Sequence, residues 1–169
     1  SMIGDMESAG ILNALADKSA YKWMQASIEA EIGEAYFNLR DFESAKAHYE
    51  KTLTYPQGLE PKAEAQFNLA YIAEMQYPND PYIAIQMYQD YIKKYPTDIW
   101  TSDALLRMAG LYHIYGDYEQ AVTLYTEVVQ NHPEKRADVV AQQAIDYIFA
   151  NQWDSYEVAT GLPAQNLES

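Results

Sequence analysis

The apolar residues of this chain recur at intervals of three and four, the spacing of amphipathic helices that bury one face. The pattern is clearest between Ser102 and Pro133, where a short polar turn joins two such stripes. The stripe residues are Leu105, Met108, Ala109 and Tyr112, followed by Tyr118, Ala121, Val122, Tyr125, Val128 and Val129. This segment therefore predicts two amphipathic helices packed as a hairpin.

The turn between the two stripes carries signals that stop one helix and start the next. Gly116 can end the first helix in the left-handed conformation, and Asp117 is placed to cap the second. Pro133 lacks an amide hydrogen and ends the second helix. Ala109 and Ala121 are small where the two helices must approach each other closely. These features are typical of a structural repeat.

Two imperfect copies of this hairpin precede it. We expect a helical domain over 19–151, with hairpins at about 19–56, 61–96 and 98–133. Gly33 lies inside the first predicted helix, where glycine costs about 1 kcal/mol relative to alanine. We therefore expect the backbone of a neighbouring helix to pack close to Gly33.

The segments that flank the three hairpins are less regular. Residues 1–18 predict a short N-terminal segment or capping helix, 136–151 a closing helix, and 152–169 a C-terminal tail. The residues in phase on the closing helix are Val140, Ala144, Tyr147 and Ile148. The tail residues expected to pack on it are Trp153 and Tyr156.

Composition narrows the possible functions. With 169 residues, seven glycines and no strand-forming blocks, the chain is expected to be all-helical. Its formal charge of −14 repels phosphate backbones and anionic lipids, so we expect no nucleic-acid partner and no membrane adsorption. No apolar run approaches the roughly 18 residues needed to span a bilayer. The absence of cysteine excludes disulfides, thiolate catalysis and zinc–thiolate sites.

The candidates for chemistry have simpler structural interpretations. His48, His113 and His132 lie in different segments and lack the two-histidine helical spacing of a zinc site. Close carboxylate pairs such as Glu29 with Glu31 are interpreted as ordinary acidic helix surface. The sequence provides no nucleophile or glycine-rich phosphate loop beside them. We therefore expect no enzymatic activity, no metal and no cofactor.

Small residues and tyrosines recur at equivalent positions of the three hairpins. The small residue of the first helix is Gly33, Ala70 or Ala109, and that of the second is Ala45, Ala84 or Ala121. A tyrosine follows the second small residue by four positions, and a proline ends each hairpin: Tyr49, Tyr88 and Tyr125, then Pro56, Pro96 and Pro133. This pattern resembles the tetratricopeptide repeat (TPR) family, whose helix–turn–helix units are about 34 residues long.

The resemblance implies a fold and a compartment. It implies an all-α TPR solenoid, a right-handed superhelix of three repeats plus capping helices. The linker YPTDIWTSDAL also resembles TPR units of bacterial cell-envelope proteins, such as the periplasmic Tol-Pal coordinator and the outer-membrane assembly lipoprotein. That likeness favours a bacterial periplasm or envelope over the cytoplasm. Ser1 precedes Met2, so we interpret Ser1 as a remnant of tag removal.

The resemblance also separates core tyrosines from candidate binding residues. The core is expected to bury Tyr36, Tyr49, Tyr88, Tyr112 and Tyr125. The first helices of the family present side chains to partners in a concave groove. In this chain the predicted groove residues are Glu31, Glu34, Phe37, Glu64, Phe67, Asn68, Tyr71, Glu74, Asp103 and Arg107.

The best-understood binding mode of the family is a clamp of lysine, arginine and asparagine around a peptide's C-terminal carboxylate. The equivalent positions are Ala30, Glu34, Asn68, Asp103 and Arg107. Only two match, and two carboxylates against one cation should repel the peptide terminus. The resemblance therefore predicts a scaffold that binds a basic, apolar-anchored protein or peptide segment. The alternatives are a structural homo-oligomerising module and an accessory domain of a larger multidomain protein.

Overall fold

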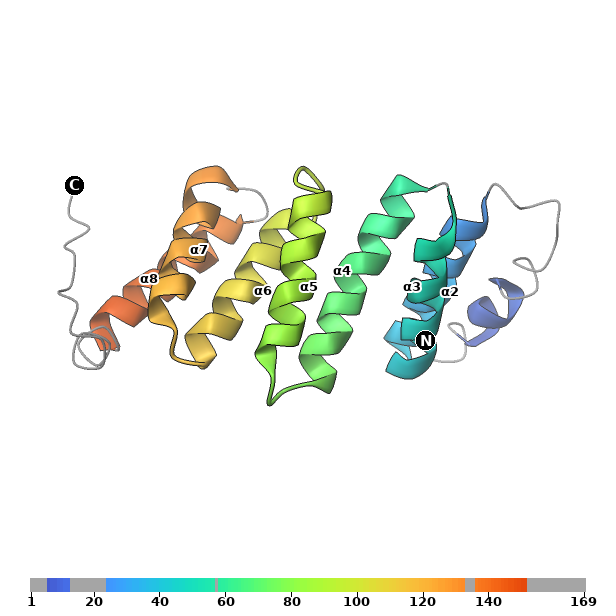
Figure 1. Cartoon of the computed structure of the whole chain (residues 1–169), viewed down its shortest axis with the longest axis horizontal. Coiled ribbons are helices and arrows are strands. Elements are labelled where there is room, and N and C mark those ends of the chain that lie inside the picture. The colour runs from blue at the N-terminus through green and yellow to red at the C-terminus, as the bar shows by residue number, and fades with distance from the viewer. Residues whose placement is uncertain (1–5, 13–23, 57, 133–135, 152–169) are drawn as a thin grey trace. The chain divides into compact units, whose positions relative to one another are not determined.

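The structure, a computed structural model, describes residues 6–12, 24–56, 58–132 and 136–151, and every regular element in these ranges is a helix. Residues 6–12 are helical. The longer helices are α2 (Gln25–Asn38), α3 (Phe42–Thr54), α4 (Leu59–Gln76), α5 (Pro81–Lys94), α6 (Thr101–Ile114), α7 (Tyr118–Asn131) and α8 (Ala137–Asn151) (Figure 1). The contacts predicted for Trp153 and Tyr156 lie outside the described residues.

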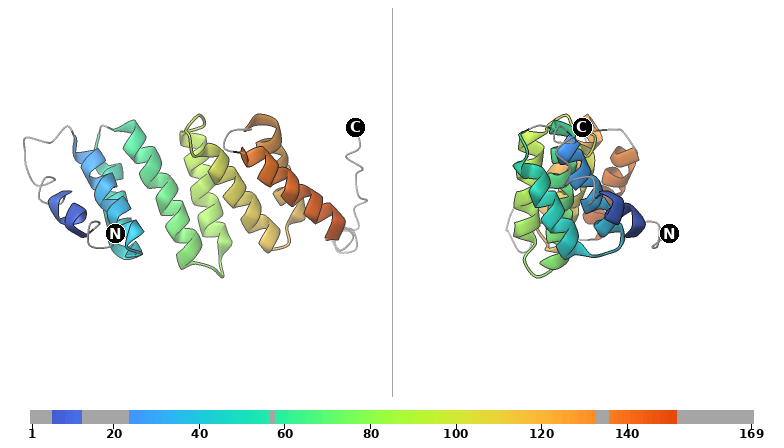
Figure 2. Two further views of the ribbon diagram at one scale, coloured as in Figure 1. Left: turned by 180° about the vertical axis from the view of Figure 1, so that it is seen from behind. Right: turned by 90° about the vertical axis from the view of Figure 1, so that its right-hand side faces the viewer.

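The helices group into two compact units, Ser1–Asp98 (unit 1) and Ile99–Ser169 (unit 2). In unit 1, each helix from α2 to α5 packs against the next, and α2 also contacts α4. In unit 2, α7 packs against both α6 and α8, and α6 also contacts α8. Figure 2 shows these neighbours from two further directions.

The turns of two hairpins are built from the same capping contacts. Asp41 accepts a hydrogen bond from the amide of Ser44 (3.1 Å), and Asp117 accepts one from the amide of Gln120 (3.2 Å). Gly116 has a φ of 82°, so the predicted left-handed helix end is confirmed. Each aspartate satisfies an amide that its helix leaves without an intrahelical partner.

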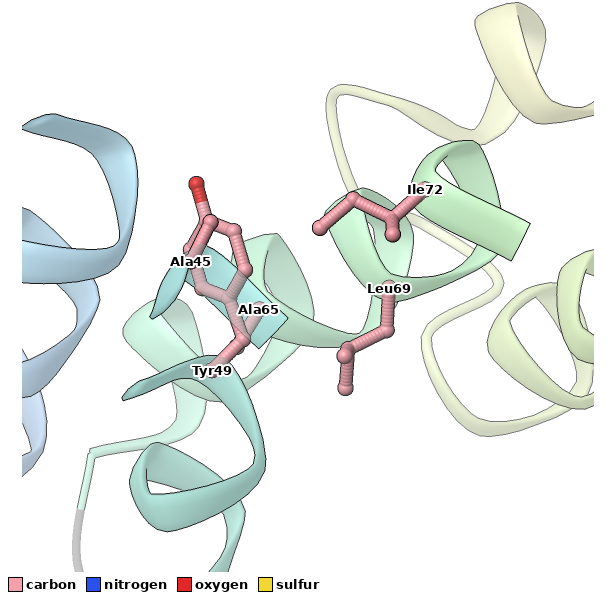
Figure 3. Packing of buried hydrophobic residues seen from close by; sticks show 5 residues of the cluster. All are labelled: Ala45, Tyr49, Ala65, Leu69 and Ile72. Carbon is pink, nitrogen blue, oxygen red and sulfur yellow. The ribbon is translucent and has the colours of Figure 1, made fainter. Parts of the chain in front are cut away.

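The core between α3 and α4 contains Ala45, Tyr49, Ala65, Leu69 and Ile72, shown in Figure 3. Tyr49 is fully buried, and its ring faces Gly33 of α2, which has no side chain. A Cβ added to Gly33 would lie 2.8 Å from the ring of Tyr49, closer than atoms can pack. The expected close contact at Gly33 is therefore present, although a tyrosine ring makes it and not a backbone.

The predicted core tyrosines are not equally buried. Tyr49, Tyr88 and Tyr125 are between 0% and 6% exposed. Tyr36 and Tyr112 are only half-buried. All three fully buried tyrosines come from the second helix of a hairpin, whereas the two half-buried ones lie near the ends of first helices.

The two units share an internal repeat that is longer than one hairpin. Helix α6 begins and ends 76 residues after α2, and α7 begins 76 residues after α3. At the same offset, Ala141, Ile145 and Ile148 of α8 correspond to the core residues of α4. The offset therefore aligns α2, α3 and α4 with α6, α7 and α8.

The predicted face of α8 is correct at Ile148 and wrong at Val140 and Tyr147. The structure buries Ala137, Ala141, Ile145 and Ile148. Val140 and Tyr147, which were predicted to be buried, are each 53% exposed. The helix packs in the register of the 76-residue repeat, in which Ala141, Ile145 and Ile148 occupy the core positions of α4.

The close packing of the second hairpin helices gives a first prediction. Ala121 is fully buried, so Ala121→Leu should overpack unit 2 and lower the free energy of unfolding by about 1–3 kcal/mol. Urea unfolding followed by circular dichroism measures the change. Gln130→Leu, at an exposed position of the same helix, is the control and should change it little. Equal unfolding midpoints for the two variants would contradict this packing.

Candidate functional site

Three glutamates form what we call the acidic face of unit 1: Glu31 and Glu34 on α2, and Glu64 on α4. Burial raises the pKa of Glu34, and the neighbouring charge of Glu31 raises it further. Burial also raises the pKa of Glu64, followed by repulsion from Glu34, Glu31, Glu60 and Asp98. The carboxylates therefore lie close enough to disfavour one another's charge.

The acidic face lies over the buried ring of Tyr49. Burial raises the pKa of Tyr49 above its ordinary range, and the charges of Glu64 and Glu34 raise it further. The side-chain amide of Asn68 donates a hydrogen bond to the Tyr49 hydroxyl (3.1 Å), which acts in the opposite direction. Asn68, a predicted groove residue, thus holds a core hydroxyl beneath the carboxylates.

An aromatic pair lies on the same helix faces as the carboxylates. The rings of Phe37 and Tyr71 are 5.4 Å apart between centroids, and both side chains are half-buried. Phe37 follows Glu34 by three residues, and Tyr71 follows Glu64 by seven, so each aromatic residue shares a helix face with a carboxylate. This arrangement combines negative charge with apolar contact area.

Two other predicted groove residues, Phe67 and Glu74, contact tyrosines of α5. Phe67 is only 8% exposed, and its ring packs 5.8 Å from Tyr88 and 5.7 Å from Tyr91. Glu74 accepts a hydrogen bond from the Tyr88 hydroxyl (3.0 Å). The spacing of α4 placed both residues near the groove, but α5 packs against that flank and covers Phe67.

The remaining predicted groove residues, Asp103 and Arg107, lie on α6 in unit 2. Both are half-buried, and they are four residues apart on one helix. The other predicted groove residues lie on α2 and α4 of unit 1. Of the clamp positions, Ala30 is 3% exposed and therefore has almost no surface to offer a peptide.

A cavity of about 320 Å³ lies in unit 1, between the start of α4 and the end of α5. Its lining residues are Leu59, Glu60, Ala63, Lys94, Tyr95, Pro96, Thr97 and Asp98. Two of these, Glu60 and Asp98, are the carboxylates that contribute to the raised pKa of Glu64. The cavity thus carries two carboxylates and the cation Lys94 in its lining.

Sequence reasoning missed a buried charge network between α2 and α3. Glu29 is 1% exposed, so its interpretation as acidic surface was wrong. Its carboxylate lies 2.8 Å from Nδ1 of His48 and 2.6 Å from Nζ of Lys51. The Tyr55 hydroxyl is 3.5 Å away, and the ring of Tyr36 stacks on His48. Opposite charges and hydrogen bonds compensate the buried carboxylate.

The helical register contains a signal for this burial. Glu29 lies four residues before Gly33 and seven before Tyr36, in the stripe that faces α3. Glu31, two residues further along, points about 200° away around the helix. In unit 2, Leu105 and Leu124 occupy the positions equivalent to Glu29 and His48. The fold therefore accepts apolar packing where unit 1 has charges.

This difference between the units gives a second prediction. His48→Leu alone should lower the free energy of unfolding by about 1–3 kcal/mol, because it removes a partner of a buried carboxylate. The double variant Glu29→Leu/His48→Leu copies unit 2 and should recover most of the loss. A double-mutant cycle in urea measures the coupling. Additive losses would show that unit 1 requires the charges.

The raised pKa of Glu64 gives a third prediction. A carboxyl with a raised folded pKa stabilises the fold only while protonated, and that contribution is lost as pH rises from the unfolded pKa through the folded pKa. At pH 7 Glu64→Gln should therefore raise the free energy of unfolding, by about 0.5 kcal/mol after allowance for solvent screening. The gain should shrink as pH falls toward 4.5, the ordinary pKa of glutamate.

Thermal unfolding at several pH values measures this effect. Glu50→Gln, at an exposed position of α3, removes the same charge away from the acidic face and is the matched control. A gain in Glu50→Gln as large as in Glu64→Gln would mean that net charge, and not the local cluster, sets the effect.

The described residues contain no group of three or more histidine, cysteine, aspartate or glutamate side chains that could hold a metal ion. Across the same ranges, each helix is too short or too polar to cross a bilayer.

Comparison with known families identifies the repeats. One tetratricopeptide repeat profile matches residues 64–98 and 103–135, and a second matches 30–56. Together the matches cover more than half of the chain, which therefore belongs to the tetratricopeptide repeat family. A search of curated proteins finds no match. The family match and the all-helical structure confirm the predicted all-α TPR solenoid. TPR domains generally mediate protein–protein interactions and are typically non-enzymatic scaffolds.

Proposed function

We propose that the chain is a protein-binding scaffold whose acidic face binds a basic segment of a partner. The mutual repulsion of Glu31, Glu34 and Glu64 carries this proposal. Within the described residues, none of the three makes an ion pair. A cation from a partner would relieve the repulsion, so lysine or arginine side chains gain more here than at isolated surface carboxylates.

The aromatic pair supplies the apolar part of the same contact. Phe37 and Tyr71 are half-buried on helix faces that also carry the carboxylates, so part of each side chain stays accessible to solvent. Aromatic side chains give contact area at a small entropic cost and are frequent anchors in interfaces. The preferred ligand is therefore a segment with cationic residues next to an apolar anchor.

Changing the salt concentration separates the electrostatic contribution to peptide affinity from the apolar one. A basic peptide with one leucine or phenylalanine anchor should bind the full chain, and its affinity should fall as salt rises from about 50 to 300 mM. Glu34→Gln/Glu64→Gln should weaken binding about tenfold or more and reduce the salt dependence. Tyr71→Ala should weaken binding while leaving the salt dependence unchanged. Fluorescence anisotropy measures both quantities.

The matched control is Glu50→Gln/Glu127→Gln, which removes two charges from exposed positions on second helices. This variant should bind the basic peptide like the unmodified chain. Binding of short acidic C-terminal peptides that Arg107→Ala abolishes, together with no binding of basic peptides, would overturn the proposal.

A further inference from the structure

The contact between the rings of Phe37 and Tyr71 fixes how α2 and α4 lie along each other. The two helices run in the same direction (Figure 1), and the ring centroids are 5.4 Å apart. Glu31 lies six residues before Phe37, and Glu64 lies seven residues before Tyr71. Both carboxylates therefore lie at the same level on neighbouring helices, about 9–10 Å along the helix axes from the rings. Glu34 lies one turn nearer to the rings.

The groups around the acidic face come from α3, from α4 and from the end of α5. The buried phenol of Tyr49 lies beneath the carboxylates, and Glu60 and Asp98 add two further negative charges. Lys94 lines the cavity with Glu60 and Asp98, but its Nζ lies over the ring of Tyr95, 5.3 Å from the centroid. Among the residues that the structure describes, Lys94 forms no ion pair. The cluster is thus a set of like charges.

This arrangement couples the charge of the acidic face to protons. Each carboxylate in a cluster of like charges makes it harder to charge the next, so the cluster binds protons more readily than isolated glutamates do. The raised pKa values of Glu34 and Glu64 agree with this geometry. A lysine or arginine side chain beside the cluster has the opposite effect, because it favours the charged carboxylates. Proton binding and cation binding therefore oppose each other at this surface.

The fold does not require this cluster. The residues of unit 2 at the three positions of the acidic face, 76 residues later, are Arg107, Gly110 and Val140. Unit 2 therefore forms the equivalent three helices with a cation, with no side chain and with an apolar side chain at these positions. Packing does not account for three repelling carboxylates in unit 1, which favours a role in recognition and its control.

We propose that the acidic face is a proton-regulated surface, which holds a basic segment near neutral pH and releases it in mild acid. The inference rests on the proposed function, because it concerns the regulation of the same site. Near neutral pH the carboxylates are charged and attract the segment. As the pH falls, the cluster takes up protons above 4.5, the ordinary pKa of glutamate, and the attraction is lost. Lysine and arginine in the segment stay charged throughout.

Peptide affinity at two pH values tests this proposal on the full chain. The probe is a basic peptide with one leucine or phenylalanine anchor, acetylated and amidated so that its ends do not titrate. At low salt its Kd should rise about fivefold or more between about pH 7.5 and pH 5.0. Glu34→Gln/Glu64→Gln should bind more weakly at the higher pH and change about twofold or less between the two. Circular dichroism at both pH values checks that the chain stays folded.

Two comparisons assign the pH effect to the cluster. Glu50→Gln/Glu127→Gln removes the same charge from second helices and should keep the full change in Kd. Glu34→Gln/Glu64→Gln retains all three histidines of the chain, which also gain charge over this range. Calorimetry in two buffers of different ionisation enthalpy should show protons released on binding near pH 5.5, about one per peptide, and fewer in Glu34→Gln/Glu64→Gln.

Two results would overturn the regulation alone. One is a Kd that is the same at both pH values, with no proton release. The other is a pH dependence as large in Glu34→Gln/Glu64→Gln as in the unmodified chain, because histidines or net charge would then set it. Both results leave binding near pH 7.5 intact, so the acidic-face proposal would stand. No binding of the basic peptide near pH 7.5 at low salt would overturn both proposals.

Discussion

The hairpin of α2 and α3 depends on one fully buried tyrosine that occupies the space left by a missing side chain. Tyr49 can lie against α2 because Gly33 has no Cβ, and no larger residue at that position avoids its ring. The same ring reaches α4, where it joins the core with Ala65 and Leu69. Its hydroxyl meets Asn68 beneath the acidic face. One side chain therefore links the packing of three helices to the surface proposed to bind a partner.

The carboxylates of the acidic face are less stable in their charged forms because they lie close to one another and to this core. Carboxylates near a buried phenol and near one another disfavour their own charged forms, and the raised pKa values of Glu34 and Glu64 express this cost. The charge network at Glu29 differs, because His48 and Lys51 compensate it within the chain. Unit 1 thus contains one buried carboxylate that the fold compensates and another set that makes no ion pair within the described residues.

The parts of the structure that could be predicted from sequence are those set by local chemistry. The cap at Asp117, the left-handed Gly116 and the tight packing at Gly33 each follow from a residue and its near neighbours. The face of α8 and the covering of Phe67 could not be predicted in the same way, because each depends on which helix packs alongside. The register of Glu29 with Gly33 indicated its burial, but its partners His48 and Lys51 come from another helix. For the candidate site, spacing placed the three carboxylates and the Phe37–Tyr71 pair on first helices. It did not show that the predicted residues belong to two separate units.

The 76-residue offset has a consequence for how recognition can diversify in such a chain. A single hairpin does not carry a complete ring pair here, because each pair, Phe37–Tyr71 and its equivalent His113–Tyr147, joins first helices from successive hairpins. Duplication of one hairpin would give a helix without its partner ring, whereas duplication of the longer block copies a whole surface. Each copy can then change its charge independently while its tyrosine and core residues stay in place. The block that carries a complete ring pair is therefore two hairpins long, twice the length of the structural repeat.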